Sequence, residues 1–293
     1  MRLATVKPHR GKIHTPLRYP GGKSRLTGFL RELISRGGWS GYTYAEPYAG
    51  GAGAALSLLV EGTVARIAIN DLDPAIHAFW RAAVDETDWF AHQVLTVPLD
   101  LDEWNRQREI YQRKSPASDA ELGFATFYLN RTNRSGVMNA GVIGGKAQSG
   151  SYRIDARFNR AELAERVRAL GALRDKIDVT MEDGANFIAR RLDDGKTFVY
   201  ADPPYYEKGS YLYLNAFDDA MHESLATVLN ARPEKPWVLT YDDAPEVRRL
   251  YAGRFQGTFK LPYSAHRSAM FAERMIVSSS VARHMDEFTP AQG

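Results

Sequence analysis

Short β-rich runs alternate with helical patterns over much of the chain, and this alternation restricts the fold more than any other feature. Parallel strands need crossover connections, which are usually helices, so repeated strand–helix units predict a mainly parallel sheet covered by helices. The runs that read as strands are residues 42–45, 64–69, 177–181, 197–201 and 237–241. The helical patterns between and after them are residues 52–61, 74–84, 184–192, 219–229 and 245–251. We therefore expect an α/β fold.

The alternation stops between about residues 85 and 172, where the sequence indicates a separate or inserted module. Three helical patterns, at 89–95, 101–114 and 120–131, lead into a glycine-rich stretch at 130–146. That stretch also contains Asn, Arg and Lys, whose side chains suit phosphates and base edges. A polar surface loop is the alternative, although loops of this length without structure of their own are usually functional or disordered.

The net charge of +3 conceals an uneven distribution along the chain. Residues 1–25 carry seven Lys or Arg and no acid, and residues 127–160 carry six against the single Asp155. The rest of the chain is left with a charge of −9. Two basic stretches on an acidic body favour a surface that binds a polyanion, with nucleic acid as the expected partner. A basic segment that is merely solvated would give the same local pattern.

The absence of cysteine and of long apolar runs excludes several classes of protein. The chain has 293 residues and no Cys, which excludes a disulfide framework, a Cys-ligated zinc or iron–sulfur site and a thiol nucleophile. Cysteine-dependent methylation of a cytosine ring carbon is excluded with them. No run approaches the roughly 20 apolar residues that cross a bilayer, and the first residues lack the apolar stretch of a secretory signal. We expect a cytoplasmic protein.

Residues 20–24, Pro-Gly-Gly-Lys-Ser, are similar to the end of a phosphate-binding P-loop. The full pattern also requires a Gly five residues before Gly22 and a strand that leads into the loop. Leu17 occupies that position and no strand precedes it, so the sequence argues against a nucleoside triphosphatase. The cluster therefore needs another explanation.

A glycine-rich turn at 46–53, Glu-Pro-Tyr-Ala-Gly-Gly-Ala-Gly, lies where a predicted strand gives way to a predicted helix. Its glycines would let a nucleoside approach the backbone closely, whereas a tight strand–helix connection is the plainer interpretation. The dinucleotide-binding fingerprint is incomplete, because Leu56 stands where its third Gly would be. Asp71 ends the next strand and is placed to bind ribose hydroxyls. Alternatively, Asp71 or Asp73 caps the helix that begins near Pro74.

The most informative segment is Asp202-Pro203-Pro204-Tyr205, which follows an apolar strand. Its acid sits at the carboxyl end of a parallel strand, where open α/β sheets bind ligands. The prolines fix the backbone and remove two N–H donors, which leaves carbonyls free to accept. Asp202 and a neighbouring carbonyl could then accept both hydrogens of an amine, while Tyr205 offers a ring for stacking on a flat base. A rigid turn without a ligand is the alternative.

Four blocks of the chain resemble, in the same order, the Dam-like (alpha-group) amino-methyltransferases, which methylate the exocyclic N6 amine of adenine in DNA with S-adenosylmethionine. The blocks are residues 17–23, residues 46–48 with the glycines that follow, residues 69–71 and residues 202–205. Weaker matches at 217–225 and 238–242 extend the resemblance over nearly the whole chain. It implies a Rossmann-like methyltransferase with a mainly parallel twisted sheet and an inserted, mostly helical DNA-recognition module.

The resemblance implies a role for each part of the chain. Residues 1–84 and 173–293 would form a discontinuous catalytic domain, and residues 85–172 the target-recognition module. The catalytic residues would be Asp202, Pro203, Pro204 and Tyr205. The residues implied to bind S-adenosylmethionine are Tyr19, Gly22, Lys23, Glu46, Gly51, Gly53, Asp71, Asp183 and Asp202. The residues implied to contact DNA are Asn130, Arg131, Asn133, Arg134, Lys146 and Arg153.

Within these sets the resemblance makes finer assignments. Tyr19 and Lys23 would lie at the methionine end of the cofactor, Asp71 at its ribose and Asp183 at its adenine. The chain departs from the family in the glycine turn, where Ala52 stands at the expected second Gly of Gly-x-Gly. The aromatic and basic residues that usually follow the DNA-contacting segment are also absent.

The resemblance further implies that a flipped-out adenine of double-stranded DNA is methylated directly, without a metal or a covalent intermediate. A cognate restriction endonuclease is an implied partner, and the expected state is a monomer or weak homodimer. The expected location is the cytoplasm of a bacterium, in association with the nucleoid, and the protein would be encoded by the bacterium or by a phage. Cytosine-amine enzymes more often carry Ser in place of Asp202 and protein glutamine methyltransferases carry Asn, which argues against both. RNA as substrate and a silent cofactor-binding or DNA-binding module are the remaining alternatives, although all candidate catalytic side chains are present.

Overall fold

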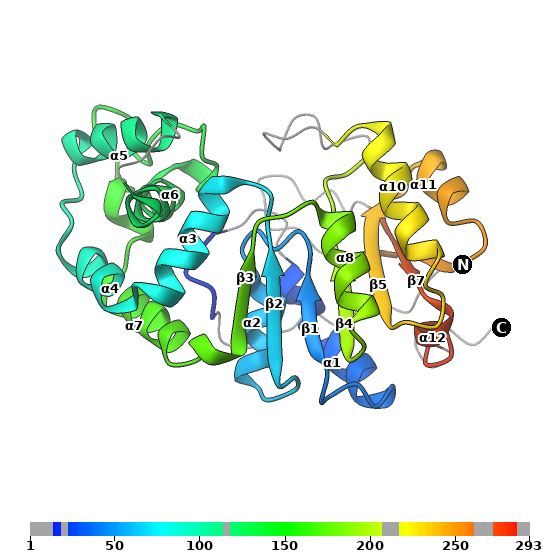
Figure 1. Cartoon of the computed structure of the whole chain (residues 1–293). Coiled ribbons are helices and arrows are strands. Elements are labelled where there is room, and N and C mark those ends of the chain that lie inside the picture. The colour runs from blue at the N-terminus through cyan, green and yellow to red at the C-terminus, as the bar shows by residue number, and fades with distance from the viewer. Residues whose placement is uncertain (1–13, 19–22, 114–117, 207–216, 261–271, 286–293) are drawn as a thin grey trace. The chain divides into compact units, whose positions relative to one another are not determined.

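The computed structural model describes residues 14–18, 23–113, 118–206, 217–260 and 272–285. The chain divides into two compact units (Figure 1). The first unit contains residues 1–12, 23–71 and 182–293, and the second contains residues 13–22 and 72–181. The second unit therefore includes all of the predicted module at 85–172, together with the residues that flank it.

A seven-stranded sheet has the order β3-β2-β1-β4-β5-β7-β6 (Figure 1). The strands are β1 (Thr43–Glu46), β2 (Arg66–Asn70), β3 (Ile177–Thr180), β4 (Thr197–Ala201), β5 (Trp237–Asp242), β6 (Phe255–Lys260) and β7 (Ala272–Val277). β1 is parallel to β2 and β4, β4 is parallel to β5, and β7 is antiparallel to both β5 and β6. The predicted α/β class is confirmed, and the five predicted strands are present within two residues of their expected bounds. Strands β6 and β7 were not among the predicted strands.

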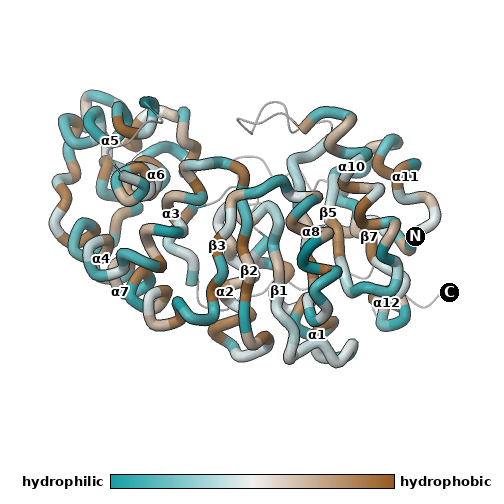
Figure 2. Tube along the Cα trace, viewed as in Figure 1, coloured by the Kyte–Doolittle hydropathy of each residue, from teal (hydrophilic) through white to brown (hydrophobic). Residues whose placement is uncertain are grey.

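Helices of the first unit pack on the sheet, which removes their apolar faces and the apolar side chains of the strands from water. They are η1 (Lys23–Leu26), α1 (Thr27–Arg36), α2 (Gly53–Val60), α8 (Gly184–Asp193), α10 (Asp219–Asn230), α11 (Pro245–Leu250) and α12 (Ser279–Ala282). Helix α8 alternates between hydrophobic and hydrophilic residues along its length (Figure 2). Its apolar face packs with α10 over β4 and β5, where Phe187, Leu225 and Trp237 are fully buried.

Helix α6 (Asp119–Thr132) is the centre of the second unit, and eleven successive residues from Leu122 to Thr132 are buried in it. It contacts α3 (Pro74–Asp85), α4 (Thr87–Thr96), α5 (Leu101–Arg113), η2 (Arg134–Gly136) and η3 (Ile154–Arg157). The unit also contains α7 (Arg160–Gly171), which packs on α3 and α4, and η4 (Arg174–Lys176). Aromatic rings fill the space between α3, α4 and α6, with Phe90 5.4 Å from both Phe124 and Phe127 between ring centroids. Such tilted and edge-to-face ring pairs add stability beyond their buried area.

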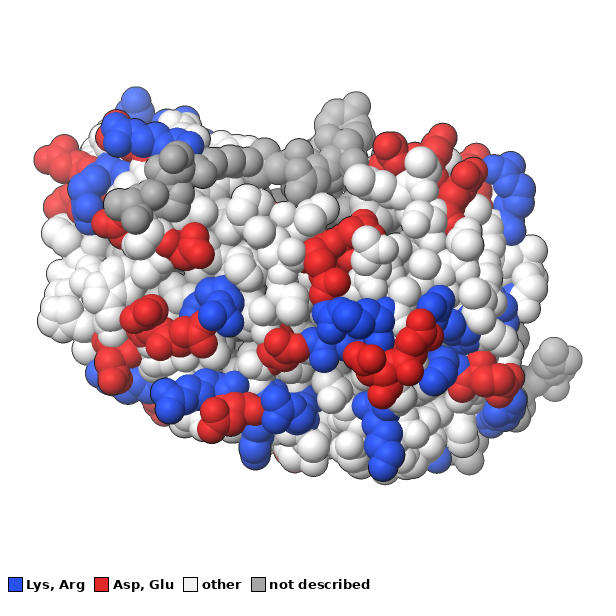
Figure 3. Space-filling model, in the orientation of Figure 1, with Lys and Arg blue, Asp and Glu red and all other residues white. Residues whose placement is uncertain are grey.

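The surface of the first unit over α8 and α10 carries charges of both signs in ion pairs (Figure 3). Arg190 pairs with Glu182, and Arg232 pairs with Asp193 at 2.6 Å. Mixed charges of this kind give little net attraction for a polyanion, so this surface is a poor nucleic-acid interface. Within the described ranges, every helix is too short or too polar to traverse a lipid bilayer.

The close approach of α3 and α6 depends on Gly123. A Cβ atom at this position would lie 2.4 Å from the backbone oxygen of Ala78, a distance at which one helix must move. Gly123→Ala should therefore lower the free energy of unfolding by about 1–3 kcal/mol, although Ala is the better helix former. The measurement is denaturant unfolding followed by circular dichroism.

The matched control is Gly28→Ala in α1, where the nearest heavy atom to an added Cβ is 3.6 Å away on the flexible Arg31 side chain. This change should raise stability by about 0.5–1 kcal/mol, because Ala restricts the unfolded chain more than Gly does. Equal effects of the two substitutions would contradict the proposed steric role of Gly123.

Candidate active site

The carboxyl ends of two neighbouring parallel strands bring the predicted acids to one edge of the sheet. Glu46 is the last residue of β1, and Asp202 directly follows β4. β1 and β4 pair in parallel, while the chain continues from β1 to β2 on one side and from β4 to β5 on the other. Such a reversal of strand order creates a crevice beyond the strand ends, which is where open α/β sheets bind ligands.

Asp202 is held on both carboxylate oxygens and stays accessible. Its Oδ1 accepts a hydrogen bond from Thr240 Oγ1 at 2.7 Å, and its Oδ2 lies 3.1 Å from Lys23 Nζ. The Thr240 hydroxyl is in turn hydrogen-bonded to Tyr200 at 2.8 Å. The Asp202 side chain is 23% exposed, and each carboxylate oxygen has a second lone pair. The carboxylate is thus oriented by its neighbours and can still accept hydrogen bonds from a ligand.

Tyr205, the last residue of the tetrapeptide, is fixed through its hydroxyl. The hydroxyl accepts from Lys23 Nζ at 2.7 Å and donates to Glu273 Oε1 at 2.8 Å. Burial, with Asp202 and Glu273 nearby, raises the pKa of Tyr205 far above its ordinary value, so the phenol stays protonated and can donate. Lys23 had been assigned to the methionine end of a cofactor by resemblance, and the structure places its ammonium beside the tetrapeptide.

The backbone after the tetrapeptide is anchored to the end of β5. Tyr206 N–H donates to Asp242 Oδ1 at 2.9 Å, and the Tyr206 hydroxyl donates to Asp219 at 2.7 Å. Asp242 and Thr240 belong to the weakly matching segment 238–242, but no local pattern singles out either residue. Their role is visible only once β5 is known to lie beside β4.

The glycine turn after β1 is organised around a buried acid. Glu46 Oε1 accepts from Tyr44 OH at 3.1 Å and from the Ala55 backbone N–H of α2 at 3.0 Å. Burial raises the pKa of Glu46 to about 8, although both hydrogen bonds act in the opposite direction. Glu46 thus ties the strand to the helix, and its predicted contact with a cofactor remains a prediction.

Ala52 takes the left-handed backbone conformation that a glycine would take without strain. Its φ is 43°, and it occupies the position immediately before α2. This is the position at which the resemblance led us to expect the second Gly. A non-glycine residue in this conformation costs on the order of 1 kcal/mol or more, so the turn keeps its shape at some expense in stability.

The structure separates the two acids that compete for the cap of α3. Asp73 Oδ1 accepts from the Ala75 backbone N–H at 2.9 Å and is the helix cap. Asp71 Oδ2 instead accepts from the Gly50 backbone N–H at 2.8 Å, which joins the end of β2 to the glycine turn. The capping interpretation of Asp71 is therefore wrong. Its carboxylate lies beside the turn, where its predicted role at a ribose remains open to test.

Asn70 connects three segments at the same edge of the sheet. Its Nδ2 donates to the backbone oxygens of Pro47 at 3.0 Å and Glu182 at 2.9 Å, and its Oδ1 accepts from the Glu182 N–H at 2.9 Å. Glu182 precedes Asp183, which caps α8 through the Asn186 N–H at 3.0 Å. The carboxylates of Asp71 and Asp183 are both partly exposed, so each can accept from the hydroxyl or amine groups of a nucleoside.

Three of the six predicted DNA-contacting residues are buried within the second unit. Asn130 accepts from the Arg18 N–H at 2.7 Å and donates to the Arg18 and Gly136 oxygens. Arg131 donates to the Pro16 oxygen at 2.7 Å, and burial lowers its pKa to about 9. Asn133 accepts from Trp104 Nε1 at 2.7 Å. These side chains satisfy the backbone and the core of the unit, so direct contact with DNA by any of them remains a prediction.

The other three, Arg134, Lys146 and Arg153, are exposed. The stretch at 130–146 is also more ordered than the predicted loop, because its first residues end α6 and Asn133 pairs with Val142 in an isolated bridge. Asn and Arg bind backbone carbonyls as readily as phosphates, and so residue type alone could not separate the buried members from the exposed ones. Tyr19 and Gly22 lie outside the described residues, and the cofactor contacts of Gly51 and Gly53 remain predictions.

The chain matches the family model of the D12 class N6 adenine-specific DNA methyltransferases over residues 19–270. Among curated proteins, no significant match is found. Solved structures with some likeness include the rRNA methyltransferase AviRa of Streptomyces viridochromogenes, with 16% identity, 91% of this chain and 89% of that chain covered, and a TM-score of 0.36. Another is a Pyrococcus horikoshii protein provisionally assigned as an RNA methyltransferase, with 13% identity, 94% and 92% coverage and a TM-score of 0.36.

Likenesses at such TM-scores carry no weight here, and the assignment rests on the family match. That match spans most of the chain, includes the glycine turn and the tetrapeptide at 202–205, and ends at residue 270, before β7 begins. It confirms the resemblance to adenine amino-methyltransferases. The chain therefore belongs to the family of D12 class N6 adenine-specific DNA methyltransferases.

Proposed function

We propose that this protein transfers a methyl group from S-adenosylmethionine to the exocyclic N6 amine of a flipped-out adenine in double-stranded DNA. The observation that carries the proposal is the geometry of Asp202. Its carboxylate is fixed by Thr240 and Lys23 at the carboxyl end of β4, yet it remains partly exposed and able to accept. The first unit would be the catalytic domain and the second unit would recognise DNA.

The residues at the edge of the sheet suit a nucleoside cofactor. The partly exposed carboxylates of Asp71 and Asp183 are acceptors at the ends of successive segments. The glycine turn donates its Gly50 N–H to Asp71, and Asn70 joins Pro47 to Glu182, the residue before Asp183. We assign Asp71 to the ribose and Asp183 to the adenine of the cofactor. When bound, S-adenosylmethionine supplies an activated methyl group that needs no covalent enzyme intermediate.

Asp202 and the tetrapeptide act on the substrate amine. The lone pair of this amine is delocalised into the adenine ring, which makes the nitrogen a poor nucleophile. Asp202 accepting one amine hydrogen and a proline carbonyl accepting the other would hold the nitrogen nearer to tetrahedral geometry. Tyr205 would stack on the flipped base, and flipping costs a few kcal/mol that stacking and phosphate contacts offset.

Phosphate contacts would supply most of the DNA affinity, and Arg134, Lys146 and Arg153 are the exposed candidates. A cognate restriction endonuclease as partner and a monomer or weak homodimer as the functional state remain predictions of the resemblance. The decisive experiment is expression of the protein in cells, followed by nucleoside analysis and methylation-aware sequencing of their DNA. N6-methyladenine at a defined site is expected, whereas N4-methylcytosine or methylated RNA alone would overturn the proposal.

Asp202→Ala should abolish methyl transfer while the protein still folds, because the side chain is at a strand end and its loss opens no core cavity. Asp202→Asn should be severely impaired too, since the amide presents a donor where the substrate amine needs an acceptor. Radiolabelled methyl transfer and thermal unfolding are measured on the same preparations. A folded Asp202→Ala variant with wild-type turnover would contradict the role of Asp202.

Asp71→Ala should weaken S-adenosylmethionine binding by about 1–3 kcal/mol, the scale for a hydrogen bond to a charged group. Titration calorimetry measures the affinity, and Asp73→Ala is the matched control. Loss of Asp73 removes a helix cap and should cost about 1 kcal/mol of stability without changing cofactor affinity. Equal affinities for Asp71→Ala and wild type would remove Asp71 from the cofactor site.

Arg153→Ala and Asn130→Ala should separate DNA contact from internal support. Loss of an exposed phosphate contact should lower the slope of log affinity against log salt by about 0.9 and leave stability unchanged. Loss of the buried Asn130 amide, which makes three hydrogen bonds, should lower stability by roughly 1–3 kcal/mol. Duplex binding at several salt concentrations and denaturant unfolding are measured on both variants. A loss of stability in Arg153→Ala, with a lower salt slope and unchanged stability in Asn130→Ala, would contradict the two roles.

A further inference from the structure

A buried acid outside the tetrapeptide completes the site. Glu273 lies on β7, near the C-terminal end of the described chain, and is 2% exposed. We propose that Glu273 is a positioning residue that holds Lys23 and the ring of Tyr205 in the arrangement required for methyl transfer. The inference rests on the proposed function for its consequence in catalysis, whereas the positioning itself can be measured without turnover.

The Tyr205 hydroxyl is held between an ammonium and a carboxylate. Lys23 donates to it at 2.7 Å, and it donates to Glu273 at 2.8 Å, so both its acceptor and its donor capacities are used. The Lys23 nitrogen also lies 5.2 Å from the centroid of the Tyr205 ring. These two hydrogen bonds give the phenol one preferred orientation. Without them, the ring could rotate about its Cα–Cβ bond. The ring that would stack on the substrate base is therefore oriented before the base arrives.

Lys23 is shared between two carboxylates. Its Nζ lies 3.1 Å from Asp202 Oδ2 and 3.4 Å from Glu273 Oε2. The ammonium stabilises the charged form of Glu273 against burial, which by itself raises the pKa of that carboxyl. Glu273 in return attracts Lys23, so that Asp202 does not hold the ammonium alone. Without Glu273, Lys23 would be free to move fully onto Asp202 and compete with the substrate amine for its lone pairs.

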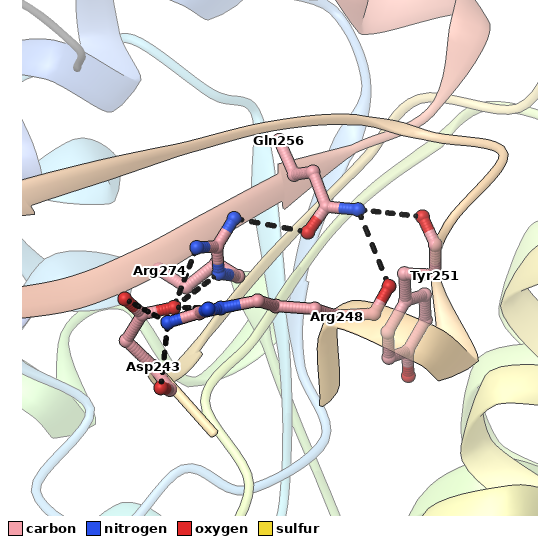
Figure 4. Close-up of polar contacts among 5 residues, drawn as sticks. All are labelled: Asp243, Arg248, Tyr251, Gln256 and Arg274. Carbon is pink, nitrogen blue, oxygen red and sulfur yellow. Dashed lines mark hydrogen bonds and ion pairs between the residues drawn. The ribbon is translucent and has the colours of Figure 1, made fainter. Parts of the chain in front are cut away.

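The position of Glu273 depends on the register of β7, which the backbone pairing with β5 and β6 sets and which the side chains on the other face of the strand match. Successive residues of a strand point to opposite faces, so Glu273 and its neighbour Arg274 face opposite ways. Arg274 donates to Asp243 at 2.6 Å and to Gln256 Oε1 at 3.0 Å, and Asp243 also binds Arg248 (Figure 4). These contacts join β7 to the end of β5, to β6 and to α11. A shift of one residue would exchange the two buried charges between incompatible surroundings.

This arrangement supplies a matched pair of variants on one strand. Glu273→Gln keeps the size of the side chain and an acceptor for Tyr205, but it removes the charge that holds Lys23. Arg274→Gln disturbs a buried charge of the same strand on the face away from the tetrapeptide. Both are compared with wild type for turnover at saturating S-adenosylmethionine and DNA, for affinity for S-adenosylmethionine and for thermal unfolding.

We expect Glu273→Gln to lower kcat at least about tenfold with cofactor affinity within about twofold of wild type. Arg274→Gln should lower the unfolding temperature and leave the kcat of the folded fraction unchanged. A double-mutant cycle with Tyr205→Phe tests whether Glu273 acts through the hydroxyl. In the Tyr205→Phe background the further loss on Glu273→Gln should shrink to less than about threefold, because the two changes act on the same interaction. Fully additive losses, or equal kcat losses in the two strand variants, would overturn the proposal.

A spectroscopic measurement keeps this inference separate from the proposed function. 3-Fluorotyrosine incorporated at position 205 reports the ring environment by 19F NMR, with no substrate present. Its resonance should move toward that of a solvent-averaged ring in Glu273→Gln and keep its position in Arg274→Gln. If the wild type methylated no adenine but the resonance moved as expected, the proposed function would fail and the positioning role would stand. An unmoved resonance in Glu273→Gln would overturn the positioning role whatever the turnover.

Discussion

The parallel pairing of β1 with both β2 and β4 is the constraint on which the candidate site depends. It places the ends of three strands along one edge, so that Glu46, Asp71 and Asp202 lie together although more than 150 residues of chain separate the first from the last. A residue at or just after the end of any of these strands therefore lies near the others. Asn70 and Thr240 reinforce this by joining the segments beyond the strand ends to each other.

Burying several charged carboxylates near the strand ends costs free energy, and this cost is lowered in a different way at each acid. Burial raises the pKa of Glu46 to about 8, so at neutral pH much of this group is protonated and carries no charge into the core. Glu273 is instead opposed by the ammonium of Lys23. Asp202 keeps contact with solvent, with 23% of its side chain exposed. Of these three acids, Asp202, which is proposed to meet the substrate, is thus the one left both oriented and accessible.

Features that depend on residues close together in the sequence could be predicted, and features that depend on distant residues could not. The strands and helices of the parallel half were predicted because period, β-branched content and turn residues act over a few neighbours. Glu273 was missed because its place depends on β7 inserting antiparallel between β5 and β6, which no local pattern encodes. The available signal was that Glu273 lies two residues before the apolar run at 275–277. This signal alone does not distinguish a buried acid from an acid at the exposed end of a strand. The choice between Asp71 and Asp73 likewise needed the distance to Gly50.

The predicted cofactor segment at 19–22 is flanked on each side by residues with well-defined hydrogen bonds. On one side, Asn130 binds both the N–H and the oxygen of Arg18, while Arg131 and Arg166 bind the oxygens of the two residues before Leu17. On the other side, Lys23 is bound by Asp202, Tyr205 and Glu273. Asn130 and Arg131 thus use their polar groups to hold the segment before Tyr19, which explains why these two residues of the predicted recognition segment are buried. In the proposed function, contact with DNA therefore falls to the exposed Arg134, Lys146 and Arg153.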